Sequence, residues 1–480
     1  MPNGPGEAWR SPHQPDHSFN APVNMSPRPF CVLAFASLGW ALASLPAATP
    51  PPPNIVLILA DDLGTGHVGW QNPQVKTPHL DRMAKEGVQL SRHYVAPVCS
   101  PTRVALLTGR YWSRFGCTNA LPSELDSTVV AMPPGTPTLS ASLQAAGYRT
   151  ALIGKWHLGA SLESGPEKFG FDYFYGLRVG GMTPLSHKWL GEGKSALWRN
   201  DKVVEEPGHI TDLLAREAVE WLGKDSSQPF FLYLAFTSPH VPLSESEQWM
   251  GLYKDSDVDL SHQLYWAAIS HLDDAVGRVV AEVDRLGQRD NTLFIFLSDN
   301  GAPGQPNRMQ VKQDLESYPA VRLPGDNLPF RGSKGDVYEG GVRTPGFVYW
   351  QGKLQPGVCD LPLSITDWMP ALCALAGCKP QSNVKWDGHD ILPVLTGRTA
   401  HPGSRILYWK GPNRASAVSE DHWKLIVTDK TVELYNLAED IGEKEDLAAK
   451  HPDLVRQLRG KLESQSAKDN DAVPKRSDSQ

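Results

Sequence analysis

A run of six apolar residues followed by two acidic ones occurs at Ile55-Val56-Leu57-Ile58-Leu59-Ala60-Asp61-Asp62. Its six apolar residues do not alternate with polar ones, which predicts a strand that is buried on both faces, as in a parallel sheet. The run ends directly in two acidic residues. Because open parallel sheets bind their ligands at the carboxyl ends of the strands, we expect Asp61 and Asp62 to lie at the functional edge.

Two later runs have the same character and end in the same way. Residues 230–236 are apolar and lead to Ser238-Pro239-His240, and residues 293–297 lead to Ser298-Asp299-Asn300-Gly301. Apolar residues with helical spacing occur at 77–86, 138–146, 212–222 and 264–286. Strands that alternate with helices predict an α/β fold with a doubly wound, mostly parallel sheet flanked by helices.

The pattern changes after about residue 365. Short apolar runs at 406–409, 423–427 and 432–437 are joined by tight polar loops, which predicts a small antiparallel sheet. We expect a closing helix at 454–462 and a polar, disordered tail at 464–480. The sequence therefore predicts a main domain over residues 53–365, which carries the motifs described below, and a smaller C-terminal α+β subdomain over residues 366–463.

The first 48 residues do not have the pattern of a folded domain. Residues 1–24 are polar and rich in Pro, His and Asn, and we expect a non-native or disordered leader there. Residues 25–48 combine a basic start, a short apolar run and small residues, which is typical of a secretory signal peptide. The apolar run is shorter than the roughly 20 residues that cross a membrane. We therefore expect an exported protein, secreted, periplasmic or lysosomal, without a stable membrane anchor.

The composition argues against two broad classes of protein. The chain has 480 residues, of which 40% are hydrophobic and 21% are charged, so it is too apolar to be disordered as a whole. The formal net charge of −7 argues against a nucleic-acid-binding protein, which would carry a basic face. A local basic pocket on an acidic protein still allows an anionic substrate.

The cysteine count sets one thiol apart. Of six cysteines, Cys31 lies in the predicted signal peptide, which leaves Cys99, Cys117, Cys359, Cys373 and Cys378. An odd count in an exported protein indicates that one thiol has a role outside disulfide bonding. The other four allow three pairings, and the sequence does not choose among them.

The strongest motif is Cys99-Ser100-Pro101-Thr102-Arg103, followed by Leu107-Thr108-Gly109-Arg110. In this motif the chain resembles the sulfatase family, in which C-x-P-x-R marks a cysteine that is oxidised to formylglycine, also called 3-oxoalanine. The resemblance covers roughly residues 53–440. It is greatest to arylsulfatase B-like enzymes, through Gly154-Lys155-Trp156-His157-Leu158-Gly159 and residues 331–343.

The resemblance implies a sulfuric ester hydrolase with an alkaline-phosphatase-like sheet. Its substrate would be an aryl sulfate or a sulfated carbohydrate, and a formylglycine-generating enzyme would convert Cys99 during maturation. A formylglycine hydrate is suited to this hydrolysis, because it carries two hydroxyls on one carbon. One can attack sulfur, and the second can then lose its proton and expel sulfate, which a serine in the same place cannot do without water.

The acidic residues predict a metal site. Asp61, Asp62, Asp299 and Asn300 each follow an apolar run, so they can meet at one edge of the sheet. Oxygen ligands favour a hard cation such as Ca²⁺ or Mg²⁺ over zinc. By resemblance the four residues hold one Ca²⁺, with Cys99 as a further ligand. Either acidic pair alone would also suit a turn or a helix cap.

A set of cationic and imidazole side chains completes the predicted site. A sulfate ester spreads negative charge over its oxygens as it is transferred, and fixed cations stabilise that charge. By resemblance Lys155, His240 and Lys334 contact the sulfate, and one of the last two protonates the leaving oxygen. His157 is then the base that takes the hydrate proton. Arg103 orients and stabilises the hydrate.

Two other functions are compatible with the same motifs. One is a phosphonate monoester or phosphodiester hydrolase on the same scaffold, and the other is a glycan-binding pseudoenzyme. The loops 179–194 and 302–323 would set the specificity, because such loops carry binding residues on a rigid scaffold. Sugar rings could stack on the aromatic residues Trp189, Trp198, Trp249 and Tyr318.

Overall fold

The structure, a computed structural model, describes residues 51–189, 193–224, 227–307, 318–378, 385–399 and 403–473. The predicted leader (1–24) and signal peptide (25–48) lie outside these residues, as do parts of the two specificity loops. Export therefore stays a prediction. Within the described residues, no helix is both long enough and apolar enough to cross a membrane.

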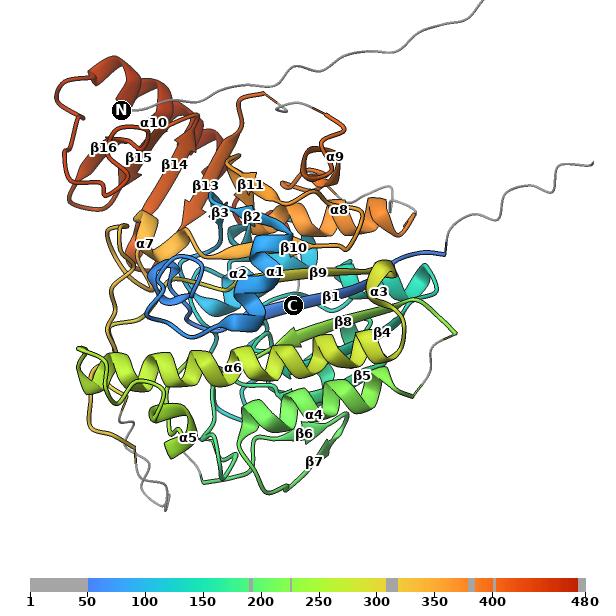
Figure 1. Ribbon diagram of the computed structural model, residues 1–480. Coiled ribbons are helices and arrows are strands. Elements are labelled where there is room, and N and C mark those ends of the chain that lie inside the picture. Colours follow the sequence, from blue (N-terminus) through green and yellow to red (C-terminus); the bar gives the residue numbers. More distant parts are fainter. Residues whose placement is uncertain are drawn as a thin grey trace, which may run out of the picture. The chain divides into compact units, whose positions relative to one another are not determined.

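The main element is a ten-stranded sheet (Figure 1) with the strand order β11-β2-β10-β9-β1-β8-β4-β5-β6-β7. Its strands are β1 (Asn54–Ala60), β2 (Val88–Leu90), β4 (Arg149–Lys155), β5 (Tyr173–Leu177), β6 (Trp198–Arg199), β7 (Lys202–Val203), β8 (Phe230–Ala235), β9 (Thr292–Ser298), β10 (Gly346–Tyr349) and β11 (Gly357–Cys359). The five strands from β9 to β5 are parallel. The predicted strands β1, β8 and β9, and the mostly parallel sheet, are confirmed.

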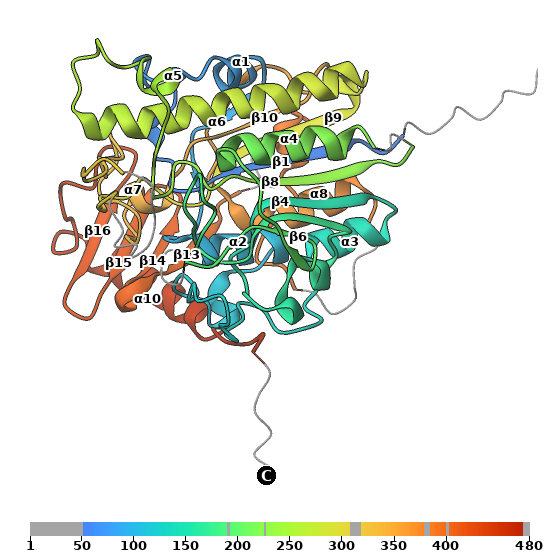
Figure 2. The ribbon, with the colours of Figure 1, turned by 90° about the horizontal axis from the view of Figure 1, so that it is seen from below.

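Helices cover both faces of this sheet, as the doubly wound prediction requires. Figure 2 shows one group on one side of the strands and a second group on the other. The first group is α1 (Pro78–Glu86), α4 (Ile210–Leu222), α5 (Glu247–Met250) and α6 (Leu260–Arg285). The second group includes α2 (Cys99–Thr108), α3 (Leu139–Ala145) and α8 (Trp368–Leu375). All four helices predicted in this region are present, with ends that differ by a few residues.

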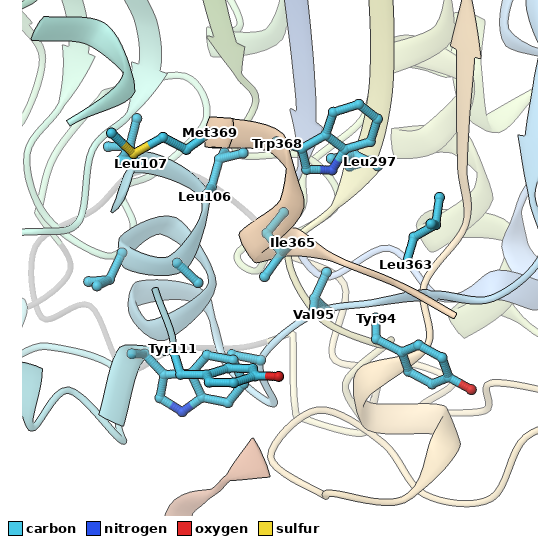
Figure 3. Close-up of a cluster of buried hydrophobic side chains, with 14 of the residues drawn as sticks. Tyr94, Val95, Leu106, Leu107, Tyr111, Leu297, Leu363, Ile365, Trp368 and Met369 are labelled. Carbon is cyan, nitrogen blue, oxygen red and sulfur yellow. The ribbon is translucent and has the colours of Figure 1, made fainter. Parts of the chain in front are cut away.

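Strand β1 divides the core because its side chains alternate between the two faces. Val56 and Ile58 pack with α1, α4 and α6. Leu57 and Leu59 pack in the second cluster, together with α2 and α8. Figure 3 shows part of that cluster, where Met369 of α8 lies beside Leu107 of α2. The absence of polar alternation in β1 therefore reflects burial on both faces.

The C-terminal region forms the predicted antiparallel sheet, with four strands instead of three. They are β13 (Ile406–Lys410), β14 (Ser416–Glu420), β15 (Trp423–Val427) and β16 (Val432–Asn436), in that order. The sequence does not show β14, because Ser416-Ala417-Val418-Ser419-Glu420 is short and half polar. Its burial comes from pairing with a strand on each side. Contacts group the chain from Pro51 onward into one compact unit, and the boundary at residue 365 stays a prediction.

Short elements complete the described structure. A two-stranded sheet joins β3 (His93–Tyr94) to β12 (Leu363–Ser364). The remaining α-helices are α7 (Glu339–Val342), α9 (Leu392–Leu395) and α10 (Pro452–Ser466). Single 3₁₀ turns occur at η1 (Thr65–His67), η2 (Trp112–Phe115), η3 (Leu162–Ser164), η4 (Pro166–Phe169), η5 (Arg289–Asn291), η6 (Ile365–Asp367) and η7 (Pro412–Arg414).

The polar tail differs from its prediction. The closing helix α10 continues to Ser466, beyond the predicted end at 462. Arg114 is buried and donates to both the carbonyl and the side chain of Gln465, each at 2.8 Å. The N–H of Asn470 donates to the Ser113 carbonyl at 2.9 Å. Residues 464–473 are therefore ordered, because their polar groups bind a buried arginine and backbone, and residues 474–480 lie outside the described chain.

A buried ion cluster connects the C-terminal sheet to the rest of the fold. Lys424 in β15 is fully buried, and its Nζ lies 2.8 Å from Glu339 Oε1 and 3.0 Å from Glu443 Oε1. Glu443 also accepts the N–H of Glu339, the first residue of α7, at 2.7 Å. The loop before α7 carries Lys334, so this cluster fixes a segment next to the predicted site.

Lys424→Met removes the cation between two buried carboxylates. We expect the variant to lose about 3–5 kcal/mol of unfolding free energy, the usual cost of breaking a buried ion pair, measured as a lower urea midpoint. Lys450→Met is the matched control, because its pair with Glu445 is exposed on both sides and such pairs contribute only about 0–1 kcal/mol. Equal midpoints for the two variants would contradict this role of the buried cluster.

Candidate active site

The two acidic pairs meet at the carboxyl ends of neighbouring strands. Asp61 and Asp62 follow β1, Asp299 and Asn300 follow β9, and all four side chains are fully buried. The N–H of Asp62 donates to Asp299 Oδ1 at 3.1 Å. The amide of Asn300 donates to Asp62 Oδ1 at 2.7 Å. The parallel pairing of β1 with β9 thus places three carboxylates and one amide in a single cluster.

Cys99 is the first residue of α2 and lies beside this cluster. Its side chain is 2% exposed, and its Sγ and carboxylate oxygens of Asp61 and Asp299 all lie within 4.8 Å of one another. The hydroxyl of Thr102 donates to the Asp299 carbonyl at 2.6 Å, which holds α2 against the end of β9. The free N–H groups at a helix start favour negative charge at this position.

Three cations offset the buried carboxylates. Arg103 donates to Asp299 Oδ2 at 2.8 Å, and Lys155, the last residue of β4, donates to Asp61 Oδ2 at 2.5 Å. Lys334 Nζ lies 2.7 Å from an oxygen of Asp62. Burial acts to raise the pKa of Asp62, but Lys334 and then His240 outweigh it and lower the pKa to about 2.

His157 has its free nitrogen directed at Cys99. Its Nε2 faces the Leu121 carbonyl at 3.1 Å, and because a carbonyl only accepts, Nε2 carries the hydrogen. The lone pair of Nδ1 then lies 3.3 Å from Cys99 Sγ. Burial, with Lys155 and Arg103 nearby, lowers the pKa of His157 well below its usual value. The neutral ring can therefore accept a proton from the Cys99 side chain.

His240 borders the cluster beside Asp62. Its Nδ1 donates to the Val241 carbonyl at 2.6 Å, and its Nε2 lies 3.8 Å from Asp62 Oδ2. Burial, followed by Lys334, lowers the pKa of His240 to about 3. Its ring is thus neutral here, with Nε2 facing the site.

The donor set fits a hard cation. Two buried oxygens, Asp61 Oδ1 and Asn300 Oδ1, have no hydrogen-bond partner among the described residues. Unpartnered buried oxygens of this kind are rare and suit a cation that binds oxygen ligands. Carboxylate oxygens of Asp61 and Asp62 also lie close to a ring nitrogen of His240. The same carboxylates therefore border the imidazole of His240. The fit is to Ca²⁺ or Mg²⁺, because carboxylate and amide oxygens predominate.

The structure thus brings together every residue that the sequence predicts for the site. The side chains of these residues are fully or largely buried. The residues are Asp61, Asp62, Cys99, Arg103, Lys155, His157, His240, Asp299, Asn300 and Lys334. Two residues of the cluster have φ above zero, Asp62 at 71° and His157 at 56°. Non-glycine residues adopt this backbone only uncommonly, and Asp and His do so more often than most. The roles of the individual residues remain proposals.

The aromatic residues singled out for sugar stacking have other contacts where the structure defines them. The guanidinium of Arg178 lies 4.5 Å from the centre of the Trp198 ring. Trp249 stacks on His271 with ring centres 4.8 Å apart. None of these contacts includes a residue of the acidic cluster.

A second polar cluster, which the sequence does not indicate, adjoins His240. A small cavity of about 20 Å³ is lined by His240, His209 and Glu245, among others. His271 of α6 lies 2.9 Å from Glu245 and 3.3 Å from Asp212, measured between ring nitrogens and carboxylate oxygens. The residues of this cluster come from α4, α6 and the loop after β8. No spacing within a single element therefore indicates the cluster in the sequence.

This cluster predicts a pH-dependent contribution to stability. Burial acts to lower the pKa of His271, but Asp212 and Glu245 outweigh it and raise the pKa to about 9. Because the pKa is raised in the folded chain, the contribution of His271 to the free energy of unfolding is complete below the unfolded pKa of about 6.5. This contribution is lost as the pH rises through 9. We expect the free energy of unfolding to fall by about 3 kcal/mol over this pH range.

The test compares the wild-type chain with His271→Gln by thermal unfolding at pH 6, 7, 8 and 9.5. We expect the wild-type chain to be the more stable at pH 6, and we expect this advantage to shrink steadily toward pH 9.5. A difference that is the same at every pH would contradict the charged state assigned to His271.

Comparisons with known proteins agree with this geometry. Residues 53–378 match the family model described as Sulfatase. Arylsulfatase J of Mus musculus is 30% identical over 472 residues, covering 85% of this chain and 75% of the relative. N-acetylgalactosamine-6-sulfatase of Rattus norvegicus is 34% identical over 409 residues, covering 80% and 73%. The crystal structure of Ps i-CgsB in complex with k-i-k-neocarrahexaose has a TM-score of 0.77 at 30% identity, covering 88% of this chain and 94% of that one.

Proposed function

The chain belongs to the sulfatase family and hydrolyses sulfate esters, and we propose that Cys99 supplies the nucleophile that attacks a sulfated carbohydrate or aryl sulfate. The observation that carries the proposal is the buried cluster in which Cys99 lies beside the carboxylates of Asp61 and Asp299, with Lys155 and His157 next to it. The relatives belong to several sulfatase subgroups and do not single out arylsulfatase B-like enzymes.

Two of the proteins compared support a carbohydrate substrate. One relative is an N-acetylgalactosamine-6-sulfatase, and one structural neighbour was solved with k-i-k-neocarrahexaose bound. We propose that this chain acts on a sulfated glycan of that general kind. Aryl sulfates serve as convenient probes of the same reaction, because the sulfate group is the part that the buried cluster would bind.

The charges of the site suit an anionic ester. Asp61, Asp62 and Asp299 balance Arg103, Lys155 and Lys334, so a divalent cation would leave an excess of positive charge. When bound, Ca²⁺ supplies charge that polarises a sulfate oxygen. Lys155 and Lys334 already point into the cluster, where their N–H groups can donate to sulfate oxygens.

His157 and Lys334 divide the proton transfers. His157 Nδ1 accepts a proton at the Cys99 side chain, since its other nitrogen is fixed as a donor by the Leu121 carbonyl. Lys334 donates a proton to the leaving oxygen, because the neutral His240 ring carries its single hydrogen on Nδ1, which faces the Val241 carbonyl. Arg103 is a positioning residue in the present geometry, because it connects Asp299 to the carbonyl of Lys155.

We propose that Cys99 is converted to 3-oxoalanine, which supplies the hydroxyl nucleophile. In the folded chain the Cys99 side chain is only 2% exposed and forms the start of α2. A formylglycine-generating enzyme could not reach it there. The conversion therefore has to precede folding of this region.

Cys99→Ala removes the nucleophile without introducing a new charge. We expect aryl sulfate turnover to fall by at least about 1,000-fold, while circular dichroism and the melting temperature stay close to the wild type. Cys117→Ala is the matched control, because Cys117 is also buried but is not bonded to His157. Wild-type turnover by the Cys99→Ala variant would refute the nucleophile.

Side-by-side assays separate the alternative activities. We expect kcat/KM for an aryl sulfate to exceed that for an aryl phosphonate monoester and for an aryl phosphodiester. The reverse order would support the phosphonate or phosphodiester hydrolase. Tight glycan binding without turnover of any ester, together with an unmodified Cys99 thiol, would support the pseudoenzyme.

Removal of the cation should affect both activity and stability. Excess chelator leaves Asp61 Oδ1 and Asn300 Oδ1 without a partner, so we expect loss of aryl sulfate turnover and a lower melting temperature. Added Ca²⁺ should restore both, and a monovalent salt at equal ionic strength serves as the control. Full rates and an unchanged melting temperature in chelator would mean that the oxygen cluster holds no catalytic cation.

A further inference from the structure

The C-terminal end of α8 brings two cysteines together. Cys373 lies in the last turn and is 4% exposed, whereas Cys378 follows the helix and is half-buried. The N–H of Cys378 donates to the Cys373 carbonyl at 2.8 Å, and the N–H of Gly377 donates to the Ala374 carbonyl at 3.2 Å. Gly377 has φ of 65°. These features define a Schellman ending, in which the side chains at the Cys373 and Cys378 positions contact each other.

The thiol of Cys378 differs in reactivity from the other described thiols. The interaction between the two neighbouring thiols lowers the pKa of Cys378 and raises that of Cys373. Cys378 is also the more accessible of the two, so it is the thiol that ionises and attacks first. Burial raises the pKa of the other three described thiols, those of Cys99, Cys117 and Cys359.

We propose that Cys373 and Cys378 form a disulfide that closes the C-terminal end of α8. The oxidant is a disulfide-bearing partner, such as oxidised glutathione or a dithiol oxidase of an exporting compartment. The Cys378 thiolate attacks that disulfide and releases one thiol, and Cys373 then attacks the Cys378 sulfur and releases the second. Two S–H bonds are lost, one S–S bond forms in the chain, and the partner disulfide is reduced to two thiols.

The position of this bond connects it to the site. Cys378 Sγ donates to the Ser142 carbonyl of α3 at 3.4 Å, so the end of α8 already packs on a second helix. Past the six residues that the structure does not describe, the backbone N–H groups of Asp387 and Gly388 donate to the Gly109 carbonyl at 2.9 and 3.1 Å. Gly109 caps α2, the helix that starts at Cys99. The disulfide would therefore fix the start of a segment that returns to the nucleophile helix.

The test is an alkylation map of the full chain, equilibrated in either oxidised or reduced glutathione. The chain is unfolded without reductant, treated with iodoacetamide and cleaved before aspartate. Cleavage before Asp367 and Asp387 releases a fragment, 367–386, that contains Cys373 and Cys378 and no other cysteine. After oxidised glutathione we expect this fragment unalkylated and about 2 Da lighter than its free dithiol form, because two hydrogens are lost. After reduced glutathione we expect two alkyl groups.

Two controls make the result decisive. Cys359 lies in the separate fragment 336–359 and should take one alkyl group in both buffers. In Cys378→Ser the remaining Cys373 should be alkylated or joined to glutathione, while aryl sulfate turnover stays at the wild-type level. Two alkyl groups on fragment 367–386 after oxidised glutathione, or a bond from either cysteine to Cys117 or Cys359, would overturn the proposal. Because the readout is mass, a failure here would leave the proposed sulfatase chemistry intact.

Discussion

The structure depends on the burial of three carboxylates at one edge of a parallel sheet. Asp61, Asp62 and Asp299 are fully buried within one cluster, where their mutual repulsion and desolvation would be prohibitive without cations. Burial and the charge of Asp61 raise the pKa of Asp299 to about 6, even with Arg103 beside it. Such a cluster persists only if the surrounding fold supplies fixed positive charge, and that requirement explains much of the architecture.

Each compensating charge comes from a different element. Lys155 ends β4, Arg103 lies inside α2, and Lys334 comes from the loop before α7. The order β9-β1-β8-β4 places two acidic strand ends and one basic strand end on the same edge. The C-terminal sheet contributes indirectly, because buried Lys424 fixes the start of α7. A chain that lost any of these elements would leave buried charge uncompensated, so the fold and the site stabilise each other.

Much of the fold and site could be predicted because their signals are local. A strand buried on both faces is apolar throughout, as β1 is, and its functional residues follow it directly in sequence. Strand β14 gave no such signal, since its burial comes from neighbours in the sheet. The cluster around His271 was also hidden, because Glu245 and Asp212 reach it from separate elements. The tail was misjudged for a similar reason, as its polar residues bind the buried Arg114.

The mass of the tryptic peptide 93–103, which contains Cys99, tests the nucleophile most directly when the peptide comes from protein that turns over an aryl sulfate. We expect a peptide about 18 Da lighter than the free-thiol form, since the nucleophile requires an aldehyde in place of the thiol. The modified fraction should rise in proportion to specific activity across preparations. A peptide that retains the plain thiol in fully active protein would contradict the assignment of Cys99 as the modified nucleophile.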